Sequence, residues 1–135
     1  MKTENLETLS AAALAYLGDT VWEREVRRYL VIAGVQQPSE KSLAFVTAAA
    51  QSDALERLLP HLTEAETEVF KRGRNTVHGN VPRAATVAQY RRATGLETLF
   101  GYLDLAGEQA RIAELFALAF PPQEDADTDA KEVTP

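Results

Sequence analysis

The sequence predicts an all-α fold, and three kinds of local observation support this class. Residues that cap or end helices recur along the chain, and the apolar residues between them are spaced three or four apart. No stretch shows the alternation of apolar and polar residues that is typical of a half-buried strand, and no internal repeat is present. A chain of 135 residues has the size of one ordinary domain. We therefore expect one helical bundle around one core.

The first long helix is expected to begin after Ser10, which is a preferred N-cap residue, and to run to Ile32 or Ala33. Gly34 follows directly and suits the C′ position, where the backbone often adopts a positive φ. Gly18 lies inside this helix. It is either a tolerated glycine or a place where another helix or a ligand approaches the backbone.

A second helix is expected from a cap at Ser39 to a stop at Pro60, and a third from the capping box formed by Thr63 and Glu66 toward Arg72. We expect the second helix to contribute mainly to the hydrophobic core. Its apolar residues are Leu43, Phe45, Val46, Ala49, Ala50, Leu55, Leu58 and Leu59.

Helical spacing resumes after Pro82, where Val87 and Tyr90 lie three residues apart, and continues into the segment ATGLETLFGYLDL. A last amphipathic helix is expected over 108–120, because two prolines follow it. We expect residues 1–122 to form the domain and residues 123–135 to form an acidic, disordered tail.

The charge is distributed unevenly along the chain. The formal net charge is −6, but residues 124–132 alone, with five acids and one lysine, contribute −4. Residues 70–92 carry six basic residues and no acid. A local basic surface, and not the net charge of the whole protein, is what meets phosphates. The acidic composition therefore does not exclude a nucleic-acid partner.

Composition also bounds the compartment and the metal chemistry. No apolar run approaches the roughly 18 residues of a membrane span, and the first ten residues do not resemble a secretory signal or a transit peptide. We expect a cytoplasmic protein without a membrane partner. Cysteine is absent and only two histidines are present, which excludes thiolate ligands and a zinc-type histidine pair. Any metal is therefore expected to use oxygen or imidazole ligands.

Asp19 is the most informative single residue, because the stretch AALAYLGDTVWE places it among apolar neighbours. On a helix these neighbours are expected to cover both sides of the residue, so its carboxylate should be partly desolvated and should need a cation or donors. A divalent metal would satisfy it. Alternatively, an Asp after a glycine caps a restarted helix or projects into water, and this stretch taken alone favours that simpler interpretation.

Glu97 lies in a similar setting, within the apolar segment ATGLETLFGYLDL. It shares a helix face with Phe100, Gly101 and Asp104, so a carboxylate again lies beside apolar groups and a glycine. The parallel with Asp19 strengthens the metal hypothesis for both residues.

A third motif, KRGRN at 71–75, joins a helix end to a loop that carries Asn75, His78 and Asn80. Its donors suit phosphate groups. A solvated basic turn explains the same residues at least as well when the motif is considered alone.

Together the segments LAYLGDTVWE, KRGRN and ATGLETLFGYL, in this order, resemble the ribonuclease III family. The resemblance covers nearly all of residues 6–120 and is closest to the short form called Mini-ribonuclease III, which lacks a separate double-stranded RNA-binding domain. It implies a dimeric helical catalytic domain in which Asp19 and Glu97 are acidic metal ligands.

The implied activity is Mg²⁺-dependent hydrolysis of double-stranded RNA, with Mn²⁺ as a substitute ion, leaving a 5′-phosphate and a 3′-hydroxyl. The resemblance also implies a two-fold homodimer, maturation of precursor 23S ribosomal RNA, and a ribosomal protein as a possible further partner. The residues expected to bind RNA are Lys71, Arg72, Arg74, Asn75, His78 and Arg83.

Two positions depart from the larger members of that family. Ala15 and Thr94 stand where those enzymes carry further acids, four residues before Asp19 and three before Glu97. Mini-ribonuclease III resembles this chain in having the reduced pattern. The sequence leaves open whether one or two ions bind, and we expect one firmly held ion.

Two other classes of function remain compatible with these residues. One is a double-stranded RNA-binding or ribosome-assembly module that keeps the fold without cutting, as the missing acids at Ala15 and Thr94 would allow. The other is a protein-interaction domain whose acids are helix caps and whose basic loop is merely solvated.

Overall fold

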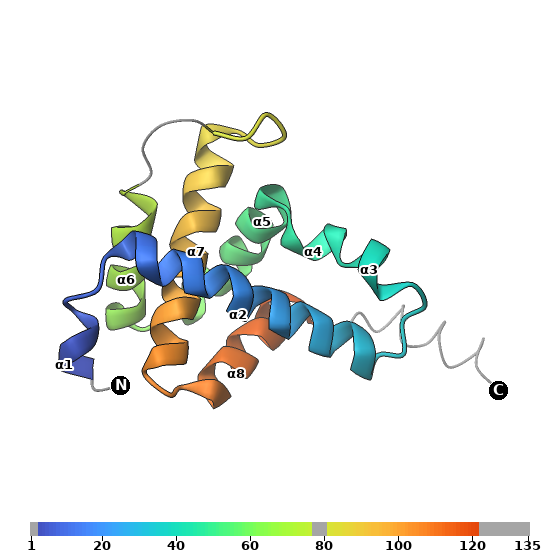
Figure 1. Ribbon diagram of the computed structural model, residues 1–135, viewed down its shortest axis with the longest axis horizontal. Coiled ribbons are helices and arrows are strands. Elements are labelled where there is room, and N and C mark those ends of the chain that lie inside the picture. Colours follow the sequence, from blue (N-terminus) through green and yellow to red (C-terminus); the bar gives the residue numbers. More distant parts are fainter. Residues whose placement is uncertain (1–2, 77–80, 122–135) are drawn as a thin grey trace.

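Helix α7 (Val87–Leu105) runs through the middle of the molecule, and four other helices pack around it (Figure 1). These are α2 (Ala11–Ile32), α5 (Ala48–Leu58), α6 (Glu64–Arg74) and α8 (Gln109–Ala119). Our computed structural model of the protein describes residues 3–76 and 81–121, and over these ranges it contains no strand. The all-α prediction is confirmed. His78 and the predicted tail, 123–135, lie outside the described residues.

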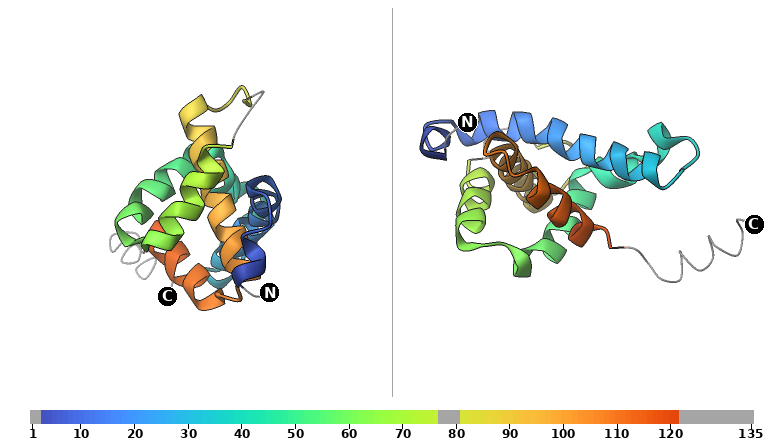
Figure 2. Two further views of the ribbon diagram at one scale, coloured as in Figure 1. Left: turned by 90° about the vertical axis from the view of Figure 1, so that its left-hand side faces the viewer. Right: turned by 90° about the horizontal axis from the view of Figure 1, so that it is seen from below.

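The boundaries of α2 follow the local signals of the sequence. The Ser10 hydroxyl accepts a hydrogen bond from the Ala13 backbone N–H at 3.0 Å, and Gly34 has a φ of 70° just after the helix ends at Ile32. Both ends of the predicted helix are therefore confirmed. Figure 2 shows α2 almost end-on in its left view, lying against α7.

The predicted continuous helix from Ser39 to Pro60 is wrong. The structure has instead α3 (Pro38–Lys41), α4 (Leu43–Val46), α5 and the 3₁₀ turn η1 (Leu59–His61). Thr47 is the physical reason, because its backbone is extended and its hydroxyl accepts from the Ala50 N–H at 3.2 Å, which caps α5. Threonine favours such a cap over a helix interior.

A second contact explains why the chain before Thr47 cannot continue as one straight helix. The indole N–H of Trp22 donates to the Phe45 carbonyl at 2.9 Å, which ties this segment to α2. Leu43, which was expected in the core, is 63% exposed.

The remaining helices begin as the caps indicate. The predicted capping box of Thr63 and Glu66 is present at the start of α6, and Thr86 with Gln89 forms another at the start of α7. Helix α8 follows its N-cap Glu108 and ends at Ala119, in agreement with the expected helix.

The core is built from α2, α5, α6, α7 and α8. Trp22 lies near its centre, with Phe100 and Phe116 at ring-centroid distances of 5.1 and 5.3 Å in edge-to-face arrangements, the geometry that aromatic pairs prefer. The buried apolar residues around it include Val21, Val26, Leu30, Leu55, Leu58, Phe70, Leu96, Leu99, Leu103, Ile112 and Leu115.

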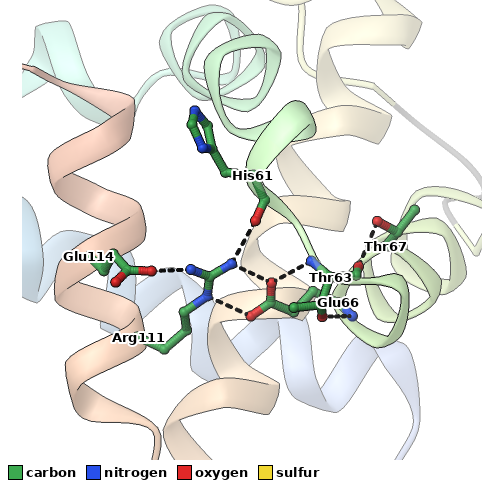
Figure 3. A network of polar contacts seen from close by, with 6 residues as sticks. All are labelled: His61, Thr63, Glu66, Thr67, Arg111 and Glu114. Carbon is green, nitrogen blue, oxygen red and sulfur yellow. Dashed lines mark hydrogen bonds and ion pairs between the residues drawn. The ribbon is translucent and has the colours of Figure 1, made fainter.

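A polar network ties α8 to the start of α6 at one end of the bundle (Figure 3). The Arg111 guanidinium donates to both Glu66 carboxylate oxygens at 2.7 and 2.8 Å, to the His61 carbonyl at 2.7 Å, and to Glu114. Glu66 also accepts from the Thr63 backbone N–H at 2.9 Å. The hydrogen bonds from Arg111 hold the pKa of Glu66 below its usual value, although burial opposes this.

The fold also includes the short helix α1 (Thr3–Leu6), whose Leu6 is buried. Among the described helices, none is both long and apolar enough to cross a membrane.

Candidate active site

Asp19 and Glu97 come together because α2 and α7 cross with their backbones in contact. A Cβ built on Gly18 would lie 1.6 Å from the Glu97 carbonyl oxygen, and one built on Gly101 would lie 2.0 Å from the Leu14 carbonyl oxygen. Neither position has room for any side chain. Gly18 is therefore a point of close helix approach, and this approach sets Asp19, the next residue, beside Glu97.

The two carboxyl groups influence each other electrostatically. Burial raises the pKa of the Glu97 carboxyl to about 8, and repulsion from the Asp19 carboxylate and a hydrogen bond with it add to the rise. Within residues 3–76 and 81–121, neither acid forms an ion pair with Lys or Arg. The raised pKa favours the protonated form of Glu97 at pH 7, and a bound cation would favour ionisation of both groups.

The expected apolar cover over Asp19 is absent in this chain. Asp19 and Thr20 are exposed, and Tyr16, one turn earlier, is 85% exposed. The prediction of a partly desolvated Asp19 is wrong because the crossing with α7 buries the adjoining stripe of α2, with Leu14, Gly18 and Val21, and leaves Asp19 outside it. Glu97 is partly buried, so the pair has one accessible and one enclosed carboxylate.

Gln51 on α5 is a residue of this site that sequence reasoning missed. It is only 4% exposed, and its side-chain Nε2 lies 3.4 Å from Glu97 Oε2. A glutamine on the apolar stripe of a predicted core helix was the available signal, because buried polar groups need partners. Its amide slightly opposes the rise in the pKa of Glu97.

The two positions that lack the further acids have ordinary structural roles. Ala15 is buried, and the Thr94 hydroxyl donates to the Tyr90 carbonyl at 3.0 Å. The part of the chain that the structure describes contains no cluster of three or more acidic, histidine or cysteine residues able to hold a metal. An ion at Asp19 and Glu97 would find no third carboxylate ligand among the described residues, and waters or a phosphate would complete its coordination.

The basic motif KRGRN ends α6 and packs against α7 next to the acidic pair. A Cβ on Gly73 would lie 2.2 Å from the Thr98 hydroxyl oxygen, and Thr98 directly follows Glu97 in the chain. This contact brings the end of α6 to the same turn of α7 that carries the acid.

The expected RNA-binding residues differ in how free their side chains are. Lys71 and Arg83 are exposed, whereas Arg72 donates to the Leu9 carbonyl and is partly buried. The Arg74 guanidinium lies 5.6 Å from the Phe70 ring centroid and donates through Nε to the exposed Asn75 side chain at 3.0 Å. Among the expected RNA-binding residues that the structure describes, Lys71 and Arg83 are thus the two exposed basic side chains.

Comparison with known proteins agrees with this arrangement. Residues 12–108 match the model of the ribonuclease III domain. The chain is 41% identical to Mini-ribonuclease 3 of Symbiobacterium thermophilum over 88% of its own length and 94% of that protein. It is 35% identical to Mini-ribonuclease 3 of Clostridium tetani, over 96% and 88% of the two chains.

A solved structure shows the same fold. The crystal structure of a Fusobacterium nucleatum protein superposes with a TM-score of 0.78 at 29% identity, covering 90% of this chain and all of that one. The chain therefore belongs to the ribonuclease III family, whose members cut double-stranded RNA and generally depend on metal ions. It is a double-strand-specific endoribonuclease.

Proposed function

We propose that this endoribonuclease cleaves its duplex at the Asp19–Glu97 pair, and that Mg²⁺ is the ion it uses, with Mn²⁺ as a substitute. The observation that carries the proposal is the pair itself: two carboxyl groups on touching helices, one of them with a pKa raised to about 8. Such a pair is costly to ionise unless a cation joins it.

The donor set fits Mg²⁺. This ion is a hard cation that prefers oxygen ligands, keeps several waters and is commonly held by only one or two carboxylates. Asp19 and Glu97 supply two, and the exposure of Asp19 leaves room for water and a phosphate. When bound, a divalent cation lowers the pKa of water and offsets negative charge on a phosphate. The products proposed are a 5′-phosphate and a 3′-hydroxyl.

The role we assign to the chain's other residues is to hold the duplex. Lys71 and Arg83 reach phosphates from exposed positions, and Arg74 and Asn75 add donors at the end of α6. Duplex RNA is recognised mostly through phosphates and 2′-hydroxyl groups across its minor groove. Arg72 contributes by fixing the N-terminal segment through the Leu9 carbonyl, in addition to its charge. His78 stays a prediction, since it lies outside the described residues.

We further propose a homodimer that acts on precursor 23S ribosomal RNA in the cytoplasm, with a ribosomal protein as a further partner. Support for the dimer comes from α2, where Tyr16, Val31 and Ile32 are all more than 70% exposed. Support for the substrate comes from the similarity to Mini-ribonuclease 3.

The test is a cleavage assay with a long RNA duplex and, separately, its single strands, in Mg²⁺ or in EDTA. Asp19→Asn and Glu97→Gln should each abolish the Mg²⁺-dependent cutting while duplex binding persists. Asp53→Asn, which changes an exposed acid on α5, is the control and should cut normally. Unchanged cleavage by Asp19→Asn would remove it from the site, and duplex binding by the wild type without any cutting would overturn the proposal as a whole.

A further inference from the structure

Gln51 is a buried polar residue to which the proposed function assigns no role. Its backbone position is fixed by the first turn of α5, where the Gln51 N–H donates to the Thr47 carbonyl at 2.9 Å and the Thr47 side chain caps the helix. Its side chain is 4% exposed and its Nε2 reaches Glu97 Oε2 at 3.4 Å. The contact joins α5 to α7, through two residues that are 46 positions apart in the sequence.

We propose that Gln51 is a positioning residue, which holds one oxygen of the Glu97 carboxylate so that the other remains directed to a divalent cation shared with Asp19. This inference rests on the proposed function, because it takes Glu97 to be a metal ligand. It adds a residue from a third helix, α5, to a site whose ligands come from α2 and α7.

The chemistry of an amide suits this task better than that of a charged donor. The Gln51 amide donates a hydrogen bond without bringing a positive charge, so it does not compete with a cation for the carboxylate. Glu66 shows the contrast within the same molecule, because the Arg111 guanidinium engages both of its carboxylate oxygens. Both oxygens of Glu66 are thus engaged by a cation of the protein, whereas Gln51 contacts only Oε2 of Glu97 and brings no charge.

Holding the carboxylate in place has a measurable consequence for metal binding. A free glutamate side chain has three rotatable bonds and loses their freedom when it ligates an ion. Partners that orient metal ligands typically change metal affinity or activity by about 10- to 100-fold when they are removed. Because the Gln51 contact is long for a hydrogen bond, at 3.4 Å, we expect an effect of about 10-fold.

The experiment compares wild type with Gln51→Met, which keeps the length and shape of the side chain but removes its donor. Initial cleavage rates of an RNA duplex are measured over a wide range of Mg²⁺ concentrations, and Mn²⁺ binding without RNA is measured by electron paramagnetic resonance. We expect the half-saturating metal concentration to rise about 10-fold in both assays, with most of the cleavage rate recovered at saturating metal.

Two controls separate this role from simple packing. Ser52→Ala changes the adjoining buried residue of α5 and should leave the metal dependence unchanged. Thermal unfolding in EDTA reports stability for each variant. Gln51→Asn, with an amide that is one methylene too short, should shift the metal dependence in the same direction and serves if Gln51→Met does not fold.

The outcomes distinguish this inference from the proposed function. A half-saturating concentration equal to wild type in a folded Gln51 variant would overturn the positioning role, as would a lower rate at all metal concentrations without a shift. In either case, loss of cleavage in Glu97→Gln would leave the proposed function standing. Wild-type cleavage and metal binding by Glu97→Gln would overturn the proposed function itself.

Discussion

Glu66 and Glu97 are two enclosed glutamates of the same helical bundle with opposite surroundings. Glu66 faces the Arg111 guanidinium, which donates to both of its oxygens, and its pKa is lowered. Glu97 faces the Asp19 carboxyl group and a neutral amide, and its pKa is raised to about 8. The first glutamate is satisfied by the protein alone. The second has no cationic partner among the described residues, and we propose that a metal ion takes that place.

The largest loss of stability is expected for Gly18→Ala, which disturbs the helix contact that places Glu97 beside Asp19. The new Cβ would lie 1.6 Å from the Glu97 backbone. Backbone atoms cannot move aside as a flexible side chain can, so α2 and α7 must separate. We expect a loss of roughly 3 kcal/mol or more in the free energy of unfolding, within the range of severe overpacking. Urea unfolding measures it.

Gly73→Ala is the matched comparison for that substitution. Its Cβ would meet the Thr98 side chain at 2.2 Å and not a backbone, so the expected loss is smaller. Equal losses in the two variants would show that the close approach at Gly18 has no special role in placing the acidic pair.

Arg111→Met should remove the feature that makes Glu66 a structural acid. Truncating one partner of an enclosed ion pair leaves the other charge poorly compensated, and we expect a loss of about 2 kcal/mol at pH 7, since Arg111 retains some exposure. Arg27→Met, which breaks an exposed pair with Glu23, should cost no more than about 0.5 kcal/mol.

The pH dependence of the Arg111 effect has a definite sign. The folded-state pKa of Glu66 lies below its ordinary value of 4.5, so the stabilisation is present above that pH and is lost as the pH falls through the folded value. The stability gap between wild type and Arg111→Met should therefore narrow under acid conditions. A gap that stays constant from pH 7 to pH 3 would contradict the assignment.

The pH dependence of stability expected for Glu97 has the opposite sign. Its folded-state pKa is raised from 4.5 to about 8, so its contribution to stability is present below pH 4.5 and is lost as the pH rises through 8. Glu97→Gln should therefore stabilise the protein in EDTA, by about 1–3 kcal/mol at pH 9 and little at pH 4. Denaturant unfolding at both pH values tests this, and a destabilised variant at pH 9 would contradict it.

These regions also show what the sequence can and cannot predict. Both ends of α2 and the start of α6 were predicted because Ser10, Gly34 and the capping box of Thr63 act within one turn of the chain. The break at Thr47 was missed because it depends on a distant contact, from Trp22 to the Phe45 carbonyl, as well as on the local cap.

The candidate site shows the same division between local and distant information. Asp19 and Glu97 were singled out from their apolar surroundings, and the structure does bring them together. The exposure of Asp19 was predicted wrongly, because which face of α2 is covered depends on how it crosses α7. Gln51 was missed because only the packing of α5 on α7 relates it to Glu97.

The smallest expected effect concerns the basic residues near the pair. Lys71→Ala and Arg83→Ala should each weaken duplex binding and reduce the slope of log K against log salt by up to about one, as expected for one lost phosphate contact. Lys41→Ala changes an exposed lysine on α3 and should leave the slope unchanged. Equal slopes in all four proteins would remove both residues from the RNA surface.

The most direct test of the central claim is a measurement of divalent cation binding to the protein without RNA. Mn²⁺ binding should be detected by electron paramagnetic resonance in wild type and should be lost or weakened by at least about 10-fold in Asp19→Asn and Glu97→Gln. Arg111→Met, if folded, should bind as wild type does. Equal Mn²⁺ binding by wild type and both acidic-pair variants would contradict the account, because it would place the ion away from Asp19 and Glu97.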